Sequence, residues 1–320
     1  MQSSALSFLD SHLASISPLP NEVRRLFHGR GKAFEGLEQL TIDWLDGQIL
    51  ISIFKEVNED FLSVLKQHIA SWLQIDAWKT QVKSVLLQYR FRMNSPIEVI
   101  FGELTERQNV VENKLKFQLD LGQKQNNGLF LDMRYGRKWV LENSQNKRVL
   151  NLFSYTCGFS VAAVAGGAQS VVNLDMAKAA LSKGRVNHQL NEHDLRQVRF
   201  LGYDLFKSWG KVKKFGPYDL IIIDPPSFQK GSFALTKDYK KILRRLHELL
   251  SEDGQVLACV NDPDLSSQFL IDEMAEHAPS MRYLRRLENP PEFIDSDPEA
   301  SLKSLLFVFD GNPGDVEVLS

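Results

Sequence analysis

The second half of the chain alternates short apolar runs with stretches of helical spacing, and this alternation restricts the fold more than any other feature. The apolar runs are RVLNLF (148–153), SVVNLD (170–175), QVRFLGYD (197–204), YDLIIID (218–224) and QVLACVN (255–261). Helical spacing separates them, as in residues 177–192 and 237–250. The pattern predicts a parallel sheet covered by helices on both faces. The wholly apolar run 220–223 predicts a central strand.

Two further runs, MRYLRRLE (281–288) and KSLLFVFD (303–310), follow without a credible crossover helix between them. Parallel neighbours need a long crossover connection, whereas antiparallel neighbours do not. We therefore expect an antiparallel edge on an otherwise parallel sheet.

The first part of the chain has a different pattern, which predicts a smaller α+β domain. Two alternating apolar runs flank Asp46-Gly47, a pair that accepts the positive φ angles of a tight hairpin turn. Around this hairpin we expect helices and strands at 4–16, 59–73, 84–92 and 97–104. The sequence thus suggests an N-terminal α+β domain, residues 1–125, and a larger α/β domain, residues 126–320.

Composition is that of a soluble globular protein, with 43% hydrophobic and 24% charged residues. No apolar run reaches the length of a membrane span, and the first residues lack the plan of a secretion signal. Cys157 and Cys259 lie in apolar surroundings, which favours reduced core thiols in a cytosolic protein. The net charge of −2 argues against general coating of nucleic acid. Local basic runs at 24–32, 211–214 and 240–247 are solvated faces or RNA contacts.

Acidic residues follow three successive predicted strands. Because ligands bind at the carboxyl ends of parallel strands, the positions of Asp175, Asp204 and Asp224 suggest a site. Asp175 is placed to accept hydrogen bonds from ribose hydroxyls, and Asp204 from an adenine amino group. The alternative is that each carboxylate caps a helix or turn.

The loop after the first strand, NLFSYTCGFS, restricts the choice of cofactor. A pyrophosphate needs several glycines for close approach to the backbone, but only Gly158 stands in this turn. Ser154, Tyr155 and Thr156 instead offer hydroxyl and backbone groups to the amino-acid end of a cofactor such as S-adenosylmethionine. Capping of a structural helix would also explain these residues.

The segment DPPSF (224–228) ends the central strand with two prolines. Proline has a fixed φ and no N–H, so carbonyl oxygens are the backbone groups available there. Such a rim suits the amino edge of a nucleobase, with Phe228 as a stacking ring. A proline-stiffened turn over a buried phenylalanine is the alternative.

The motifs GLFLDMR, VLNLFSYTCGFS, VVNLD and DPPSF together resemble class I S-adenosylmethionine-dependent methyltransferases. The resemblance is to the bacterial 23S ribosomal RNA group that holds a cytosine-C5 enzyme and a guanine-N7 module. It implies a Rossmann-like seven-stranded sheet whose last strand is antiparallel. Among the residues it implies for cofactor binding, Arg134 either lies near the pocket or pairs with Asp132. The implied cofactor residues are Arg134, Phe153, Ser154, Tyr155, Thr156, Gly158, Asp175, Met176, Asp204 and Asp224; the catalytic ones are Asp224, Pro225, Phe228 and Asn261.

Two positions depart from this group. Cys157 stands where its members usually have glycine, and we interpret it as a packing residue. The cysteine that C5 enzymes need after the fifth strand is replaced by Asn261, while Cys259 lies within the strand. Asn261 either holds a base edge or forms a turn with the following Asp-Pro. The substitution favours guanine N7, whose lone pair needs no thiol, over cytosine C5.

The leading hypothesis is therefore a cytoplasmic methyltransferase that modifies a base in RNA, most simply ribosomal RNA, with S-adenosylmethionine as cofactor. We expect the N-terminal domain, with the basic residues Arg24 to Lys32, to dock the RNA. A non-catalytic RNA-binding or assembly protein is the alternative, and a nicotinamide oxidoreductase is disfavoured by the single-glycine loop. No metal site is expected, and His188 and His193 suggest surface or capping roles.

Overall fold

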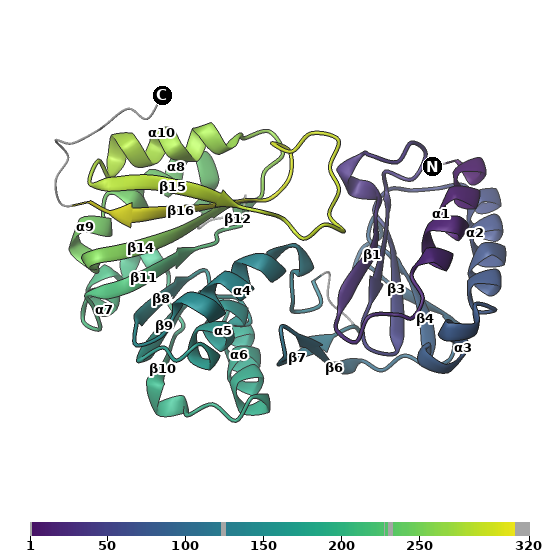
Figure 1. Cartoon of the computed structure of the whole chain (residues 1–320), viewed down its shortest axis with the longest axis horizontal. Helices are drawn as coiled ribbons and strands as arrows, with labels where there is room; N and C mark the ends of the chain where they lie inside the picture. Colours follow the sequence, from purple (N-terminus) through teal and green to yellow (C-terminus); the bar gives the residue numbers. More distant parts are fainter. Residues whose placement is uncertain (1, 123–125, 227, 230–232, 311–320) are drawn as a thin grey trace. The chain divides into compact units, whose positions relative to one another are not determined.

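The computed structural model describes all residues except 1, 123–125, 227, 230–232 and 311–320, and only the backbone of 228–229. Its contacts divide the chain into two compact units (Figure 1). The first holds residues up to Asp132 together with Pro290–Pro298, and the second holds Met133–Asn289 and the chain from Glu299 onward. The expected division at 125/126 gave 290–298 to the larger domain, whereas this segment packs with the first unit.

The segment 290–298 has specific contacts within the first unit. The Phe293 ring lies 5.0 Å from that of His28, between centroids. Ser296 N donates to the carbonyl of Gly31 at 2.7 Å, and Asp295 forms a bridge with Lys32. These contacts lie far from 290–298 in sequence, which is why periodicity could not assign the segment.

A five-stranded sheet forms the centre of the first unit. Its order is β1 (Arg24–His28), β2 (Leu40–Trp44), β3 (Gln48–Ile53), β4 (Ser84–Tyr89) and β5 (Ile97–Phe101). Only β3 and β4 pair in parallel; the other neighbours are antiparallel. It follows that β1, β3 and β4 run in the same direction and end at the same edge.

Local signals explain the elements around this sheet. The predicted hairpin is confirmed, with φ of 52° at Asp46 and 103° at Gly47 between β2 and β3. The predicted helices appear as α1 (Leu6–Ser15) and α2 (Glu59–Trp72), the latter followed by α3 (Asp76–Gln81). Asn58 caps α2 by accepting from Phe61 N at 2.8 Å. A second hairpin, β6 (Arg107–Glu112) and β7 (Leu115–Asp120), was not predicted.

The second unit contains the expected seven-stranded sheet. The strand order is β10 (Val198–Leu201), β9 (Ser170–Leu174), β8 (Arg148–Leu152), β11 (Tyr218–Ile223), β14 (Leu250–Val260), β16 (Lys303–Phe309) and β15 (Met281–Leu287). The first five strands in this order, from β10 to β14, each pair in parallel with the next. The α/β prediction is confirmed.

Helices cover both faces of this sheet (Figure 1). They are α4 (Arg134–Asn143), α5 (Gly158–Ala165), α6 (Lys178–Leu190), α7 (Trp209–Lys213), α8 (Leu235–Leu243), α9 (Leu246–Leu249) and α10 (Ser267–His277). Alternate residues of β11, Ile221 and Ile223, share a core with α7 to α10, while Ile222 is equally buried on the other face. None of the described helices is long and apolar enough to cross a membrane.

The last strand is antiparallel, as predicted, but it does not lie at the edge. β16 is inserted between β14 and β15 and is antiparallel to both. Residues 303–307 of β16 are buried, whereas residues 282–285 of β15 are exposed. The more apolar strand therefore takes the inner position. Helix α10 supplies the crossover from β14 to β15.

Cys157 is accommodated by a glycine on the neighbouring helix. It precedes α5 with a φ of 62°, and its side chain is fully buried. A Cβ placed on Gly184 of α6 would lie 2.3 Å from Cys157 Sγ. Burial also raises the pKa of the thiol, which keeps it neutral. These features agree with a packing role and not with a nucleophile.

We expect Gly184→Ala to lower the free energy of unfolding by about 1–3 kcal/mol, because the added methyl group overlaps the Cys157 sulfur. Adding Cys157→Gly should remove the overlap, so the double variant should lose less than the sum of the single losses. Urea unfolding of the four proteins measures this coupling. Additive losses would contradict the proposed overlap.

Candidate functional site

The carboxyl ends of four parallel strands are in register. Leu201, Leu174, Leu152 and Ile223 form one row across β10, β9, β8 and β11. Asp175 follows the second of these residues directly, and Asp224 follows the fourth. Strand order reverses between β8 and β11, which is where open α/β sheets bind ligands. Asp175 and Asp224 therefore lie at the edge of the sheet that favours a site, while Asp204 comes three residues after the end of β10.

The loop between β8 and α5 is strained. Phe153, Tyr155 and Cys157 have φ of 56°, 45° and 62°, a region that costs residues other than glycine about 1–3 kcal/mol each. Backbone hydrogen bonds hold this conformation: Ser154 N donates to Leu174 O at 3.1 Å, and Cys157 N to Ser154 O at 2.7 Å. The loop is thus fixed to the end of β9.

Asp175 fixes the same loop through its side chain. Its carboxylate accepts from the backbone N of Tyr155 and from that of Ala177, both at 2.8 Å. Partial burial raises the pKa of Asp175, and these two bonds oppose that effect. A carboxylate has about four acceptor positions, so two remain after these bonds. The residue can therefore shape the loop and still accept hydroxyl groups of a ligand.

Two buried oxygen atoms beside this loop suit a ligand with hydrogen-bond donors. Asn151 Oδ1 and Ser154 Oγ are buried and have no hydrogen-bond partner among the described residues. An unsatisfied buried polar atom costs about 1–3 kcal/mol. Both lie at the carboxyl end of β8. The amino and hydroxyl groups of S-adenosylmethionine are donors of the required kind, so the residues present fit that cofactor.

The remaining predicted cofactor residues have mixed surroundings. Met176 is 44% exposed, next to Asp175. Asp204 caps a short 3-10 helix by accepting from Phe206 N at 2.9 Å. The Phe153 ring packs 5.0 Å from that of Phe233, which indicates a structural contribution.

Three others lie on or beside helices. Thr156 is buried and its carbonyl accepts from Asn187 at 3.0 Å, while Gly158 begins α5. Arg134 begins α4, is buried, and stacks on the Tyr135 ring at 5.0 Å.

The DPPSF segment begins at the end of β11, the strand that pairs with β8. Asp224 is partly exposed, Pro225 is buried and Pro226 is exposed. Ser227 is outside the described residues. The backbone of Phe228 belongs to β12 (Phe228–Gln229), which pairs with β13 (Phe233–Ala234). Base stacking on Phe228 therefore stays a prediction.

Tyr239 of α8 is a residue that sequence reasoning missed. It is fully buried, and its hydroxyl lies 3.4 Å from the carbonyl oxygen of Ile223 and 3.3 Å from that of Cys259. It thereby connects the ends of β11 and β14, just before Asp224 and Asn261. In the sequence, the helical spacing of Tyr239 indicates only a core position. The available signal was its hydroxyl group, which usually finds a hydrogen-bond partner when the ring is buried.

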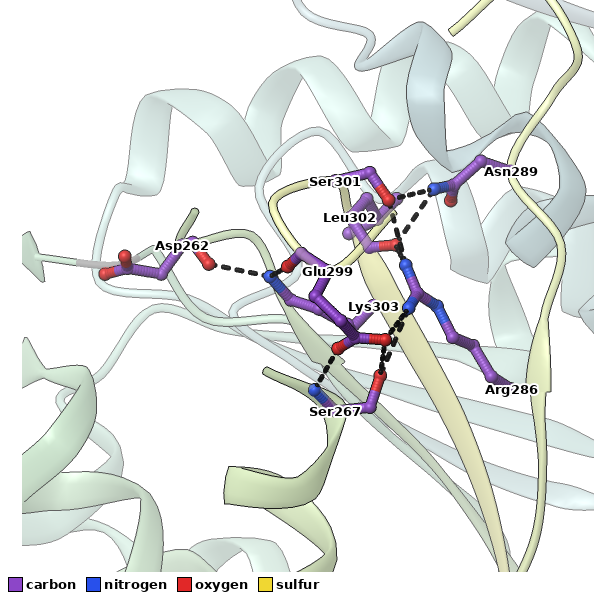
Figure 2. Close-up of polar contacts among 8 residues, drawn as sticks. All are labelled: Asp262, Ser267, Arg286, Asn289, Glu299, Ser301, Leu302 and Lys303. Atoms are coloured by element: carbon purple, nitrogen blue, oxygen red, sulfur yellow. Dashed lines mark hydrogen bonds and ion pairs between the residues drawn. The ribbon is translucent and has the colours of Figure 1, made fainter. Parts of the chain in front are cut away.

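A buried lysine anchors the segment after β14 (Figure 2). Lys303 has no exposed surface, and its Nζ donates to the carbonyls of Asp262 at 2.6 Å and Glu299 at 2.8 Å. The Glu299 carboxylate in turn accepts from Ser267 N at 2.5 Å and from Arg286 at 2.7 Å. The loop from β14 to α10 is thus held at both ends, and Asn261 stands at its exposed start.

His188 is buried, which corrects the predicted surface or capping role. A chain of side chains extends to it from the sheet: Asn151 Nδ2 donates to Asn173 Oδ1 at 3.0 Å, and Asn173 Nδ2 to Ser160 Oγ at 2.9 Å. Ser160 Oγ lies 2.9 Å from His188 Nε2, and His188 Nδ1 lies 3.0 Å from His193 Nδ1. The side chain of His188, on α6, contacts Ser160 of α5 and the ring of Phe200 in β10.

In the contact between the Nδ1 atoms of His188 and His193, one nitrogen donates and the other accepts, so at least one of the two histidines is neutral. Burial lowers the pKa of His188 to about 3, with the charges of His193 and Arg185 adding to the effect. The network therefore helps to position Asn151 and Asn173 next to the site.

No metal site is evident in the described part of the chain. Within it, no three or more His, Cys, Asp or Glu side chains are grouped so that they could hold a metal ion.

Comparison with known proteins adds a family match. The family model described as S-adenosylmethionine-dependent methyltransferase matches residues 24–308. A Bacillus subtilis protein provisionally named ribosomal RNA large subunit methyltransferase YwbD is 31% identical over 247 residues, which cover 74% of this chain and 60% of that protein. Ribosomal RNA large subunit methyltransferase I of Aeromonas salmonicida is 37% identical over 164 residues, 50% of this chain and 41% of that protein. The matches thus span about 60% or less of these relatives.

A solved structure has the same fold across both units. SMU.776, provisionally described as a methyltransferase and solved in complex with SAH, superposes with a TM-score of 0.81 at 26% identity. The match covers 96% of this chain and 80% of that one.

We expect acid to destabilise the protein through His188. Its folded pKa of about 3 is below the ordinary 6.5, so the unfolded chain binds the proton more readily. The stability it confers is present above pH 6.5 and is lost as the pH falls towards 3, by about 1.4 kcal/mol per pH unit. His188→Gln should have a shallower loss. Urea unfolding of both proteins across this range measures the difference, and equal slopes would contradict the assignment.

Proposed function

We propose that this chain, which belongs to the S-adenosylmethionine-dependent methyltransferases, methylates a base in ribosomal RNA. The cofactor supplies a methyl group bonded to a positively charged sulfur. The names of the relatives support RNA as substrate, since both assign them to large-subunit ribosomal RNA. The resemblance of the motifs to the 23S ribosomal RNA group points the same way.

In this proposal the sheet edge holds the cofactor and the base next to each other. The two acceptor positions left on Asp175 bind the ribose hydroxyls, and Asp204 binds the adenine amino group. The loop from Ser154 to Gly158 holds the amino-acid end. Asp224 and Pro225 border the methyl group, which leaves catalysis largely to alignment of the reacting atoms.

The single observation that carries the choice of atom is the burial of both cysteines. The chain has two, Cys157 and Cys259, and both are buried. Cys259 lies within β14, and its Sγ is 3.7 Å from Ser304 Oγ. Carbon 5 of cytosine needs a thiolate facing the base, whereas N7 of guanine presents a lone pair in the ring plane. We therefore favour guanine N7, with the exposed Asn261 holding the base edge.

Asp175→Ala should weaken binding of S-adenosylhomocysteine by roughly tenfold to a hundredfold, because charged hydrogen bonds to the ribose are lost. Asp194→Ala is the matched control, since Asp194 is an acid of the same unit that pairs with exposed Arg196. Isothermal titration calorimetry measures both. Equal affinities for the two variants would contradict the role of Asp175, and no binding by the parent would contradict the proposed cofactor site.

Deletion of the gene should remove one methylated nucleoside from large-subunit ribosomal RNA, with 7-methylguanosine the expected loss. Mass spectrometry of nucleosides from the deletion and parent strains measures this. Loss of 5-methylcytidine instead would overturn the choice of atom and leave the RNA substrate standing. An unchanged nucleoside profile would overturn the substrate itself.

A further inference from the structure

Three parallel strands of the first unit end near one aromatic ring. β1 leads into the short 3-10 helix Gly29–Gly31, which carries Arg30, and β3 leads into Phe54. β4 is followed by Arg90, whose backbone N donates to Ile53 O at 2.8 Å. Because these strands run in the same direction, Arg30, Phe54 and Arg90 come together at a single edge of the five-stranded sheet.

Both arginines stack on that ring. The guanidinium carbon of Arg30 is 4.3 Å from the centroid of Phe54, and that of Arg90 is 5.1 Å away. Each distance is within the range of a cation–π contact. Stacking fixes the direction in which each guanidinium group points its N–H edge, and Arg90 Nη2 already donates to Asn126 Oδ1 at 3.5 Å. The Phe54 ring therefore holds two positive charges close to it.

Two carboxylates of this unit pair with other arginines, since Glu292 lies 3.6 Å from Arg24 Nε and Asp43 pairs with Arg25. Arg25 Nε donates to Asp43 Oδ1 at 2.5 Å. Arg30 has no carboxylate within ion-pair distance among the described residues. His28 contributes no charge near neutral pH, since burial and the charges of Arg25 and Arg30 lower its pKa to about 3.

The arginines also repel one another. Partial burial lowers the pKa of Arg30, with the charge of Arg25 as a second cause. Partial burial likewise lowers the pKa of Arg90, with the charge of Arg30 next. An anion bound between them would relieve the repulsion.

We propose that Arg30 and Arg90, oriented by Phe54, bind a backbone phosphate of the RNA substrate. The inference rests on the proposed RNA substrate and assigns one contact within the first unit. The planar guanidinium fork matches phosphate geometry, and the contact is independent of base sequence. Arg30 is exposed to solvent and so is accessible to a polyanion.

The test is binding of fluorescein-labelled oligouridine to the full chain, followed by fluorescence anisotropy at several salt concentrations. Arg30→Gln and Arg90→Gln should each weaken binding by roughly fivefold to tenfold and reduce the slope of log affinity against log salt by about 0.7. Arg107→Gln, which removes the same charge from an exposed position on β6, is the matched control and should change affinity less than twofold. Arg30→Lys keeps the charge and should retain most of the affinity.

Titration with S-adenosylhomocysteine and thermal unfolding show whether each variant is folded, and both should match the parent. Parent-like RNA binding by Arg30→Gln and Arg90→Gln would overturn the inference. An equal loss in Arg107→Gln would also overturn it, because net charge alone would then explain the effect. These outcomes do not depend on methyl transfer. The proposed function is tested separately, by the nucleoside profile of the deletion strain.

Discussion

The candidate site depends on one carboxylate that holds a strained loop. Asp175 accepts the backbone N–H of Tyr155, in the middle of three residues with alternating positive φ. Without such restraint, the loop would relax to conformations of lower energy. The restraint is possible because the end of β9 is in register with that of β8. The sheet register and the conformation of the loop at the candidate site therefore depend on each other.

The sequence predicted those features that depend on neighbours close in the chain. Alternating strands and helices, the Asp46-Gly47 hairpin and acids at strand ends are all local patterns, and the structure has them where they were expected. The position of β16 between β14 and β15 was not predicted, because it depends on which of two strands has the more apolar faces. The packing of 290–298 with the first unit was not predicted because its partners there, such as Gly31 and Lys32, lie far away in the sequence.

The residues that support the site were missed because their roles depend on distant partners. Tyr239 connects two strand ends from a helix, and Lys303 reaches the carbonyls of Asp262 and Glu299. His188 has spacing that is compatible with either a surface or a core, and only the hydrogen bond to Ser160 distinguishes them. Polar residues at core positions are therefore ambiguous in sequence. The packing interpretation of Cys157, in contrast, rested on its apolar neighbours, which are local.

The segment 290–298 has a consequence for how the molecule is put together. The chain passes between the two units at 132/133, at 289/290 and again at 298/299. No single cleavage therefore releases either unit intact, and a fragment that begins at Met133 would carry residues 290–298 of the other unit with it.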